Sequence, residues 1–181
     1  MSDLSKLTSK LNLRFNDQEL LQTAFTHRSY LNETKGIKES NERLEFLGDA
    51  VLEFIVSSFL YKTRTEDAEG DLTNLRSYIV KTESLAKAAE ALELGKYLRM
   101  SRGEELSGGR DNTQLLANTF EALLGAVFLD QGIWASEKVI EKFLLPAFGK
   151  EIKSGPPKDN KSALQELIQT KFKHSPHYRI L

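Results

Sequence analysis

The sequence predicts an all-α domain followed by the opening of a smaller α+β domain. Apolar residues recur at spacings of three and four along most of residues 3–148, which is the pattern of amphipathic helices. No segment there alternates apolar and polar residues between turn signals, as a half-buried strand would. Pro156 and Pro157 then interrupt the chain in a stretch without a core-forming run. We therefore expect a helical domain at 1–149, a linker at 150–160 and an incomplete second domain at 161–181.

Taken in order, the first helix is expected in the amphipathic N-terminal segment, residues 1–15, which lacks the apolar core of a signal peptide. Four further apolar-periodic segments follow, around residues 20–25, 44–55, 72–79 and 115–127. Polar or glycine-containing breaks separate the helices, at Asn32–Ser40, Thr63–Gly70, Ser101–Arg110 and Asp130–Gly132. After the linker, residues 162–173 are typical of a helix and residues 177–181 of a first strand. One helix and one strand cannot bury a core, so this tail is predicted to be part of a domain.

Composition excludes several classes of protein. The chain has no cysteine, which rules out disulfides, thiolate nucleophiles and thiolate zinc sites and fits a cytoplasmic location. No apolar run approaches the roughly 20 residues that span a bilayer, so no membrane partner is expected.

Charge is unevenly distributed along the chain. Residues 158–181 carry five basic and two acidic residues, a charge of +3, against 20 basic and 24 acidic residues elsewhere, a charge of −4. An acidic body with a basic tail indicates a site that meets phosphate through metal ions, beside an arm that holds a polyanion. Scattered solvated charge is the alternative.

Three acids form a stripe in the segment NERLEFLGDAVL, residues 41–52. Glu42, Glu45 and Asp49 are spaced i, i+3, i+7, which places them within roughly 60° on one helix face, with Glu45 and Asp49 about 6 Å apart along the axis. The opposite face, Leu44, Leu47, Val51 and Phe54, is predicted to be core. Such a stripe is either a solvated surface, neutralised by Arg43 or water, or a cation site.

Gly48 favours the second interpretation. A glycine inside a strong helix costs about 1 kcal/mol relative to alanine and usually persists where another backbone comes close. The predicted partner is residues 115–129, LLANTFEALLGAVFL, an apolar helix that also contains a glycine, Gly125. If the helices cross near Gly48, then Asn118 and Glu121 join Glu45 and Asp49. An all-oxygen site of this kind suits Mg²⁺ or Mn²⁺ and phosphodiester hydrolysis.

These segments resemble the ribonuclease III family. The resemblance starts from NERLEFLGDAVL and continues in order through THRSY (Thr26–Tyr30), EGDLTNLRSYIV (Glu69–Val80), LELGKYLRMSRGEELSGGR (Leu92–Arg110) and ANTFEALLGAVFLD (Ala117–Asp130). It covers about residues 5–148. The tail, KSALQELIQ followed by PHYRIL, is similar to the opening of a double-stranded-RNA-binding domain, over a much shorter stretch.

The resemblance implies an all-helical homodimer that hydrolyses double-stranded RNA with Mg²⁺, for which Mn²⁺ can substitute. Each protomer would cut one strand, leaving staggered ends with 5′-phosphates and 3′-hydroxyls, and precursor ribosomal RNA and other structured RNA are the expected substrates. Carried over by motif position, the metal-binding residues are Glu45, Asp49, Asn118 and Glu121, of which Asp49 and Glu121 are catalytic; Glu42 and Glu69 are accessory acids of the cleavage valley; and Gln165 and Glu166 contact the RNA minor groove.

Asn118 departs from the family pattern, which usually has Asp at this position. An amide oxygen can still bind Mg²⁺ but adds no charge. The chain can therefore be an active natural variant, a variant that traps bound RNA, or a pseudo-enzyme. Two other functions stay open: a non-catalytic double-stranded-RNA-binding scaffold, and a helical phosphohydrolase of small nucleotides. His27 has no evident partner as a general base, so we expect a structural role for it.

Overall fold

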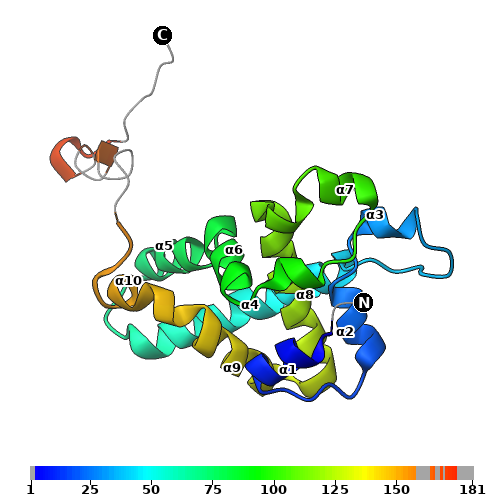
Figure 1. Ribbon diagram of the computed structural model, residues 1–181. Helices are drawn as coiled ribbons and strands as arrows, with labels where there is room; N and C mark the ends of the chain where they lie inside the picture. Colours follow the sequence, from blue (N-terminus) through cyan, green and yellow to red (C-terminus); the bar gives the residue numbers. More distant parts are fainter. Residues whose placement is uncertain (1–2, 158–163, 166–167, 169, 175–181) are drawn as a thin grey trace, which may run out of the picture.

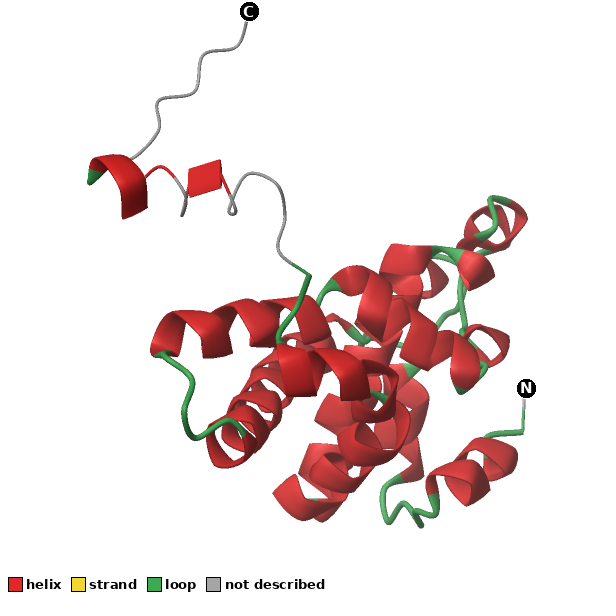
Figure 2. Ribbon diagram, turned by 90° about the vertical axis from the view of Figure 1, so that its left-hand side faces the viewer, coloured by secondary structure: helices red, strands yellow, loops and turns green. Residues whose placement is uncertain are grey.

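The computed structural model describes residues 3–157, 164, 165, 168 and 170–174. Within these ranges every regular element is helical, and extended pairing is limited to one parallel bridge between Thr26 and Arg99 (Figure 2). The all-α prediction for the first domain is therefore confirmed. Most of the expected second domain, including its strand, lies outside the described residues and stays a prediction. None of the helices in the described part is long and apolar enough to cross a membrane.

Two long helices, α4 (Glu42–Thr63) and α8 (Thr113–Gln131), share the largest helix–helix interface in the molecule (Figure 1). At the start of α8, the Asn112 side chain caps the helix by accepting a hydrogen bond from the Leu115 amide at 3.1 Å. The helix ends at Gly132, whose φ of +79° lies in the left-handed region that glycine adopts readily. Ten of the residues of α8 are buried, so this helix is the central rod of the core.

Shorter helices cover these two rods. Helices α2, α6 and α9 pack on α8, whereas α5 and α9 pack on α4. The shorter helices are α1 (Ser5–Leu11), α2 (Gln18–Ala24), α3 (Arg28–Leu31), α5 (Glu69–Ile79), α6 (Thr82–Ala91), α7 (Arg102–Leu106), α9 (Ile133–Phe143) and α10 (Gly149–Ser154), with 3₁₀ turns η1 (Leu94–Tyr97), η2 (Gly109–Asp111) and η3 (Leu145–Phe148).

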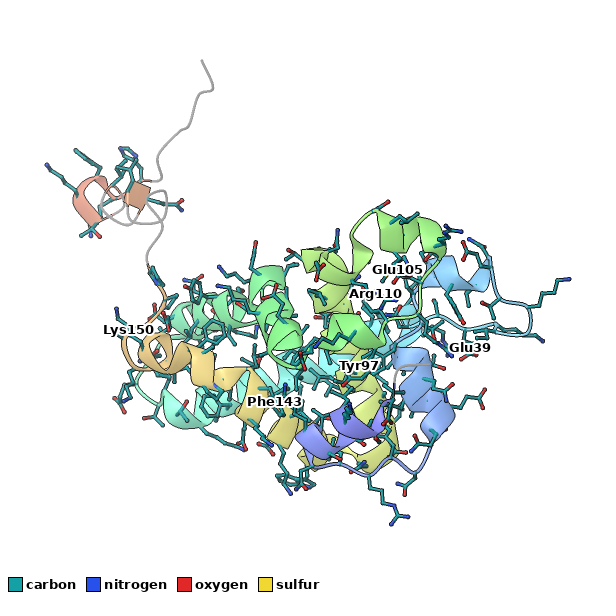
Figure 3. The ribbon with its side chains drawn as sticks, viewed as in Figure 1. Glu39, Tyr97, Glu105, Arg110, Phe143 and Lys150 are labelled. Carbon is teal, nitrogen blue, oxygen red and sulfur yellow. The ribbon has the colours of Figure 1, made fainter. Side chains whose placement is uncertain are left out.

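The predicted breaks are found, with one difference. The segment Ser101–Arg110, expected to be irregular, contains α7 and the start of η2. Ser101 caps α7 by accepting a hydrogen bond from the Glu104 amide. Arg110 then pairs with Glu105 at 2.6 Å, and the two labelled side chains lie together in Figure 3. Local capping thus forms a helix in a glycine-rich segment that is too short for apolar periodicity to predict one.

The prediction that Phe54 belongs to the core is wrong. Its side chain is 62% exposed, and on the same helix Phe46 and Tyr61 are 81% and 76% exposed. Phe54 stands seven residues after Leu47, which is only half-buried, so both lie at the edge of the buried face. Helices α8 and α5 cover the neighbouring face around Leu52 and leave an apolar stripe on α4 uncovered.

The first residues of the predicted linker are helical. Helix α10 includes Lys150–Ser154, which belong to the predicted linker, and Arg64 holds this helix against the body. The Arg64 guanidinium forms a forked ion pair with Asp67, at 2.7 and 3.0 Å, and donates to the carbonyl oxygens of Ile152, at 2.9 Å, and Lys153. The chain then turns at Gly155, and the position of the domain boundary stays a prediction.

Candidate active site

Helices α4 and α8 cross at their glycines, as the sequence predicts. A Cβ atom on Gly48 would lie 1.8 Å from the Glu121 carbonyl oxygen, and one on Gly125 would lie 2.2 Å from the Leu44 carbonyl oxygen. Only two residues without side chains allow backbones to approach so closely. The crossing places the acidic stripe of α4 beside Asn118 and Glu121 of α8.

The carboxylates of Glu45 and Asp49 lie near enough to Glu121 for their charges to act on it. Burial raises the pKa of Glu121 from 4.5 to about 7, with the negative charges of Asp49 and Glu45 adding to the effect. Burial also raises the pKa of Glu45, helped by the charges of Glu42 and Asp49 and opposed by a hydrogen bond from Asn118. Asp49 itself is exposed at the edge of the group. The fold therefore places these carboxylates together at a position where burial and mutual repulsion disfavour their charged forms.

The side chain of Asn118 is held in a defined orientation. Its Oδ1 accepts a hydrogen bond from Gln114 Nε2 at 2.6 Å, while its side chain also hydrogen-bonds Glu45. Because a carboxylate can only accept, the Asn118 amide nitrogen donates to Glu45. The amide oxygen therefore faces Gln114, and ligation of a metal by Asn118 would require the amide to turn over.

A cavity of about 350 Å³ opens beside these residues. Its lining includes Glu42, Glu45 and Asn118, together with His27 and Arg28 at the start of α3. Glu42 is exposed and pairs with Arg28 at 3.4 Å, so its counter-ion is Arg28 and not Arg43, the neighbour that the sequence suggests. His27, for which the sequence predicts a structural role, lines this cavity, a place that no local pattern predicts.

The donor set fits a hard divalent cation. All its ligand atoms are oxygens, and none of Glu45, Asp49 and Glu121 forms an ion pair with a basic side chain in the described part of the chain. In the present rotamers, the described residues contain no group of three or more Asp, Glu, His or Cys side chains that could hold a metal ion. The backbone thus brings the carboxylates together, and side-chain rotation would have to complete the coordination.

The structure does not bring every predicted site residue to this place. Glu69 begins α5, where it is exposed and accepts a hydrogen bond from Thr73 at 3.1 Å; it is not among the charges that act on Glu45 or Glu121. Gln165 is described as half-buried, whereas Glu166 lies outside the described residues. The proposed RNA-binding roles of Gln165 and Glu166 stay predictions.

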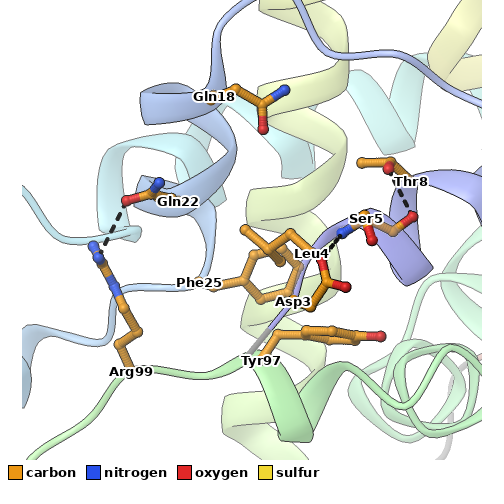
Figure 4. A pocket seen from close by; sticks show the side chains of 9 residues that line it. All are labelled: Asp3, Leu4, Ser5, Thr8, Gln18, Gln22, Phe25, Tyr97 and Arg99. Carbon is orange, nitrogen blue, oxygen red and sulfur yellow. Dashed lines mark hydrogen bonds between the residues drawn. The ribbon is translucent and has the colours of Figure 1, made fainter. Parts of the chain in front are cut away.

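Other hollows lie away from Glu45 and Glu121. The pocket in Figure 4, about 410 Å³, lies between α1, α2 and Tyr97, and its one acid, Asp3, accepts a hydrogen bond from the Ser5 amide. A wider groove, about 1030 Å³, runs between α2, residues 36–40 and the first turns of α4, with Phe46 and Leu129 in its lining. Neither contains Glu45, Asp49 or Glu121.

Comparison with known proteins yields consistent similarities. The family described as ribonuclease-III-like matches residues 17–148. A ribonuclease 3 from Pelotomaculum thermopropionicum is 47% identical over 180 residues, which cover 98% of this chain and 74% of that protein. A ribonuclease 3 from Enterococcus faecalis is 45% identical over 183 residues, covering 98% and 77%. The solved nuclease domain of ribonuclease III from Campylobacter jejuni superposes with a TM-score of 0.75 at 38% identity, covering 82% of this chain and 98% of that one.

Proposed function

The chain belongs to the ribonuclease III family and is an endoribonuclease of that type, and from this premise we propose that it hydrolyses phosphodiester bonds of double-stranded RNA with Mg²⁺. The products are staggered fragments with 5′-phosphate and 3′-hydroxyl ends. The substrates are precursor ribosomal RNA and other structured RNA, including messenger RNA, in the cytoplasm. The cysteine-free composition and the basic tail support this assignment.

The observation that carries the proposal is the crossing of α4 and α8 at Gly48 and Gly125, which gathers Glu45, Asp49 and Glu121. These carboxylates, with Asn118, would hold Mg²⁺ or, in its place, Mn²⁺. When bound, the cation polarises a phosphoryl oxygen, promotes ionisation of the attacking water and neutralises the leaving oxygen. The protein supplies the negative charge that retains the cation, and Asp49 and Glu121 are the catalytic pair. Glu42 and Glu69 contribute accessory negative charge along the RNA path.

A second copy of the chain is part of the proposed enzyme. Phe46, Phe54 and Tyr61 form an exposed apolar stripe on α4, the helix that also carries the acids. Large exposed aromatic side chains on one helix face are typical of an interface. A structure of the Campylobacter jejuni nuclease domain is described as showing flexibility in its region of dimer formation. With two copies, each active site cuts one strand of the duplex.

The alternative is a catalytically impaired scaffold that binds double-stranded RNA. The neutral Asn118, which donates to Glu45 where an Asp would add a charge, favours this function. Incubation with long duplex RNA decides between the two. We expect staggered fragments in Mg²⁺ and binding without cleavage in Ca²⁺, and Glu121→Gln should abolish cleavage without abolishing binding. Binding without cutting in either metal would support the scaffold, and hydrolysis of mononucleotides instead of duplex would support a small-nucleotide phosphohydrolase.

A further inference from the structure

Hydrogen bonds hold both the backbone and the imidazole ring of His27 in place. Its backbone amide donates to the Arg99 carbonyl at 2.9 Å, and the Arg99 amide donates to the Phe25 carbonyl at 2.8 Å. These two bonds form the parallel bridge between residues 26 and 99 and fix the backbone of His27 beside the segment that leads into α7. Helices α3 and α7, which follow these two segments, lie next to each other in Figure 1. The ring itself then contacts Ser29, the second residue of α3.

The hydrogen bonds around Ser29 assign the tautomer of His27. The Ser101 amide donates to Ser29 Oγ at 2.9 Å, and Ser29 Oγ lies 2.8 Å from His27 Nδ1. The Ser29 amide also points to Nδ1, at 3.4 Å. The contact with the Ser29 amide gives Nδ1 the role of acceptor, and we therefore assign the proton of the neutral ring to Nε2.

The Nε2–H group has no partner within the described part of the chain. Glu42, the nearest acid in sequence among those lining the same cavity, is occupied by Arg28 and by the Ser40 hydroxyl, at 3.4 and 2.8 Å. Glu45 is occupied by Asn118. His27 is half-buried and lines the cavity of about 350 Å³ next to the acidic group. The lining of this cavity therefore combines carboxylates with an N–H donor that has no partner in the described part of the chain.

We propose that His27 is a substrate-positioning residue, whose Nε2–H donates a hydrogen bond to a non-bridging phosphate oxygen of the RNA strand being cut. This inference rests on the proposed function. Carboxylates repel a phosphodiester, so a phosphate in this cavity needs hydrogen-bond donors in the lining that offset this repulsion. A donor held by Ser29 and Ser101 requires no reorientation when RNA binds, which is how an oriented dipole holds an anion most effectively.

Two isosteric substitutions separate this role from a structural one. In His27→Gln, the introduced side-chain amide can occupy the place of Nε2 and donate into the cavity, whereas the shorter amide in His27→Asn reaches only the place of Nδ1. Affinity for a short RNA duplex is measured in Ca²⁺, and the thermal midpoint is measured in parallel. We expect His27→Asn to lose affinity about tenfold or more, the effect of one hydrogen bond to a charged group. We expect His27→Gln to restore most of it, even though it loses the bond to Ser29.

The opposite order, with Asn better than Gln, or an equal loss in both variants that follows the thermal midpoint, would overturn the proposal. A duplex with 2′-fluoro groups keeps its phosphates but lacks hydroxyls. The ratio between the original chain and His27→Asn should persist on it, and its disappearance would show that the contact is to a 2′-hydroxyl.

The tautomer is tested without RNA. Long-range ¹H–¹⁵N correlation spectra of the full chain, at a pH where imidazole is neutral, should show the proton of His27 on Nε2. A proton on Nδ1 would remove the His27 contact but leave the proposed nuclease function intact. Absence of any duplex binding by the unaltered chain would instead remove the proposed function, and the RNA contact of His27 with it.

Discussion

Replacing Gly48 by alanine adds one methyl group at the crossing of α4 and α8. The new Cβ would lie 1.8 Å from the Glu121 carbonyl oxygen and 2.9 Å from the Gly125 amide nitrogen. The distance to the Glu121 carbonyl oxygen is about 1.6 Å less than the 3.4 Å at which ordinary van der Waals contact begins, so the atoms would overlap. Both obstacles are backbone atoms, so no rotamer change relieves the overlap and the helices must move apart.

The size of the effect follows from what that movement disturbs. Alanine gains about 1 kcal/mol of helix propensity over glycine. Overpacking usually costs about 1–3 kcal/mol. Because α4 and α8 pack on each other more extensively than any other described pair of helices, the cost of separating them should be at least about 3 kcal/mol. We expect a net destabilisation of about 2–3 kcal/mol, which for a chain of this size lowers the melting temperature by roughly 4–12 °C. The acids on α4 and α8 would also separate, so Mg²⁺ affinity should fall.

Urea denaturation followed by circular dichroism measures the stability, and titration calorimetry measures Mg²⁺ binding. Gly70→Ala is the matched control, because a Cβ on this helical glycine meets nothing within 4 Å. The control should be neutral or slightly stabilising and should leave metal affinity unchanged. If Gly48→Ala behaved like Gly70→Ala, the two helices would not cross in backbone contact, and the reasoning behind the acidic site would be refuted.

Three further perturbations test the site and the proposed dimer. The pKa of Glu121 is raised to about 7 in the fold, so the folded state holds a proton that the unfolded chain releases near its usual 4.5. Without metal, the free energy of unfolding should therefore fall by roughly 1–2 kcal/mol as pH rises from about 4.5 to 7, after allowance for partial exposure. Melting curves recorded with a chelator measure this fall, and Glu121→Gln should remove it. A melting temperature of the original chain that does not change over this pH range would contradict the raised pKa. Asn118→Asp should tighten Mg²⁺ binding and raise the cleavage rate, and an unchanged metal dependence would show that this position is not a ligand. Phe46→Ser should weaken self-association, as measured by sedimentation. Because the Phe46 side chain is 81% exposed, the stability of the monomer should change little. An unchanged association constant would place the interface elsewhere.

Sequence reasoning succeeded where a residue is costly without a partner. Glycines inside strong helices are unfavourable unless a backbone approaches them, so Gly48 and Gly125 predict the crossing. A glutamate in an apolar helix is equally unfavourable unless it meets compensating groups, which is why Glu121 is proposed for the site. Both inferences use local free energies that can be read from a single segment.

The missed features depend on contacts that no local pattern encodes. The Ser101 amide that orients Ser29, and through it His27, comes from 72 residues farther along the chain. The exposure of Phe54 depends on which side of α4 the neighbouring helices cover. Periodicity gives the angle between residues on a helix but not the directions from which other helices approach.

The hydrogen bonds of Arg64 to Asp67 and to the carbonyl oxygens of α10 fix the point at which the chain leaves the helical body. Arg64 follows the last turn of α4 and lies nineteen positions after Glu45 along the chain. At the rise of an α-helix this is a span of about 28 Å. Any RNA-binding segment that continues from Pro157 therefore starts at the far end of a rigid rod from the carboxylates. In the proposed enzyme, a duplex must therefore span about this distance to reach both the carboxylates and the point where the tail leaves the helical body.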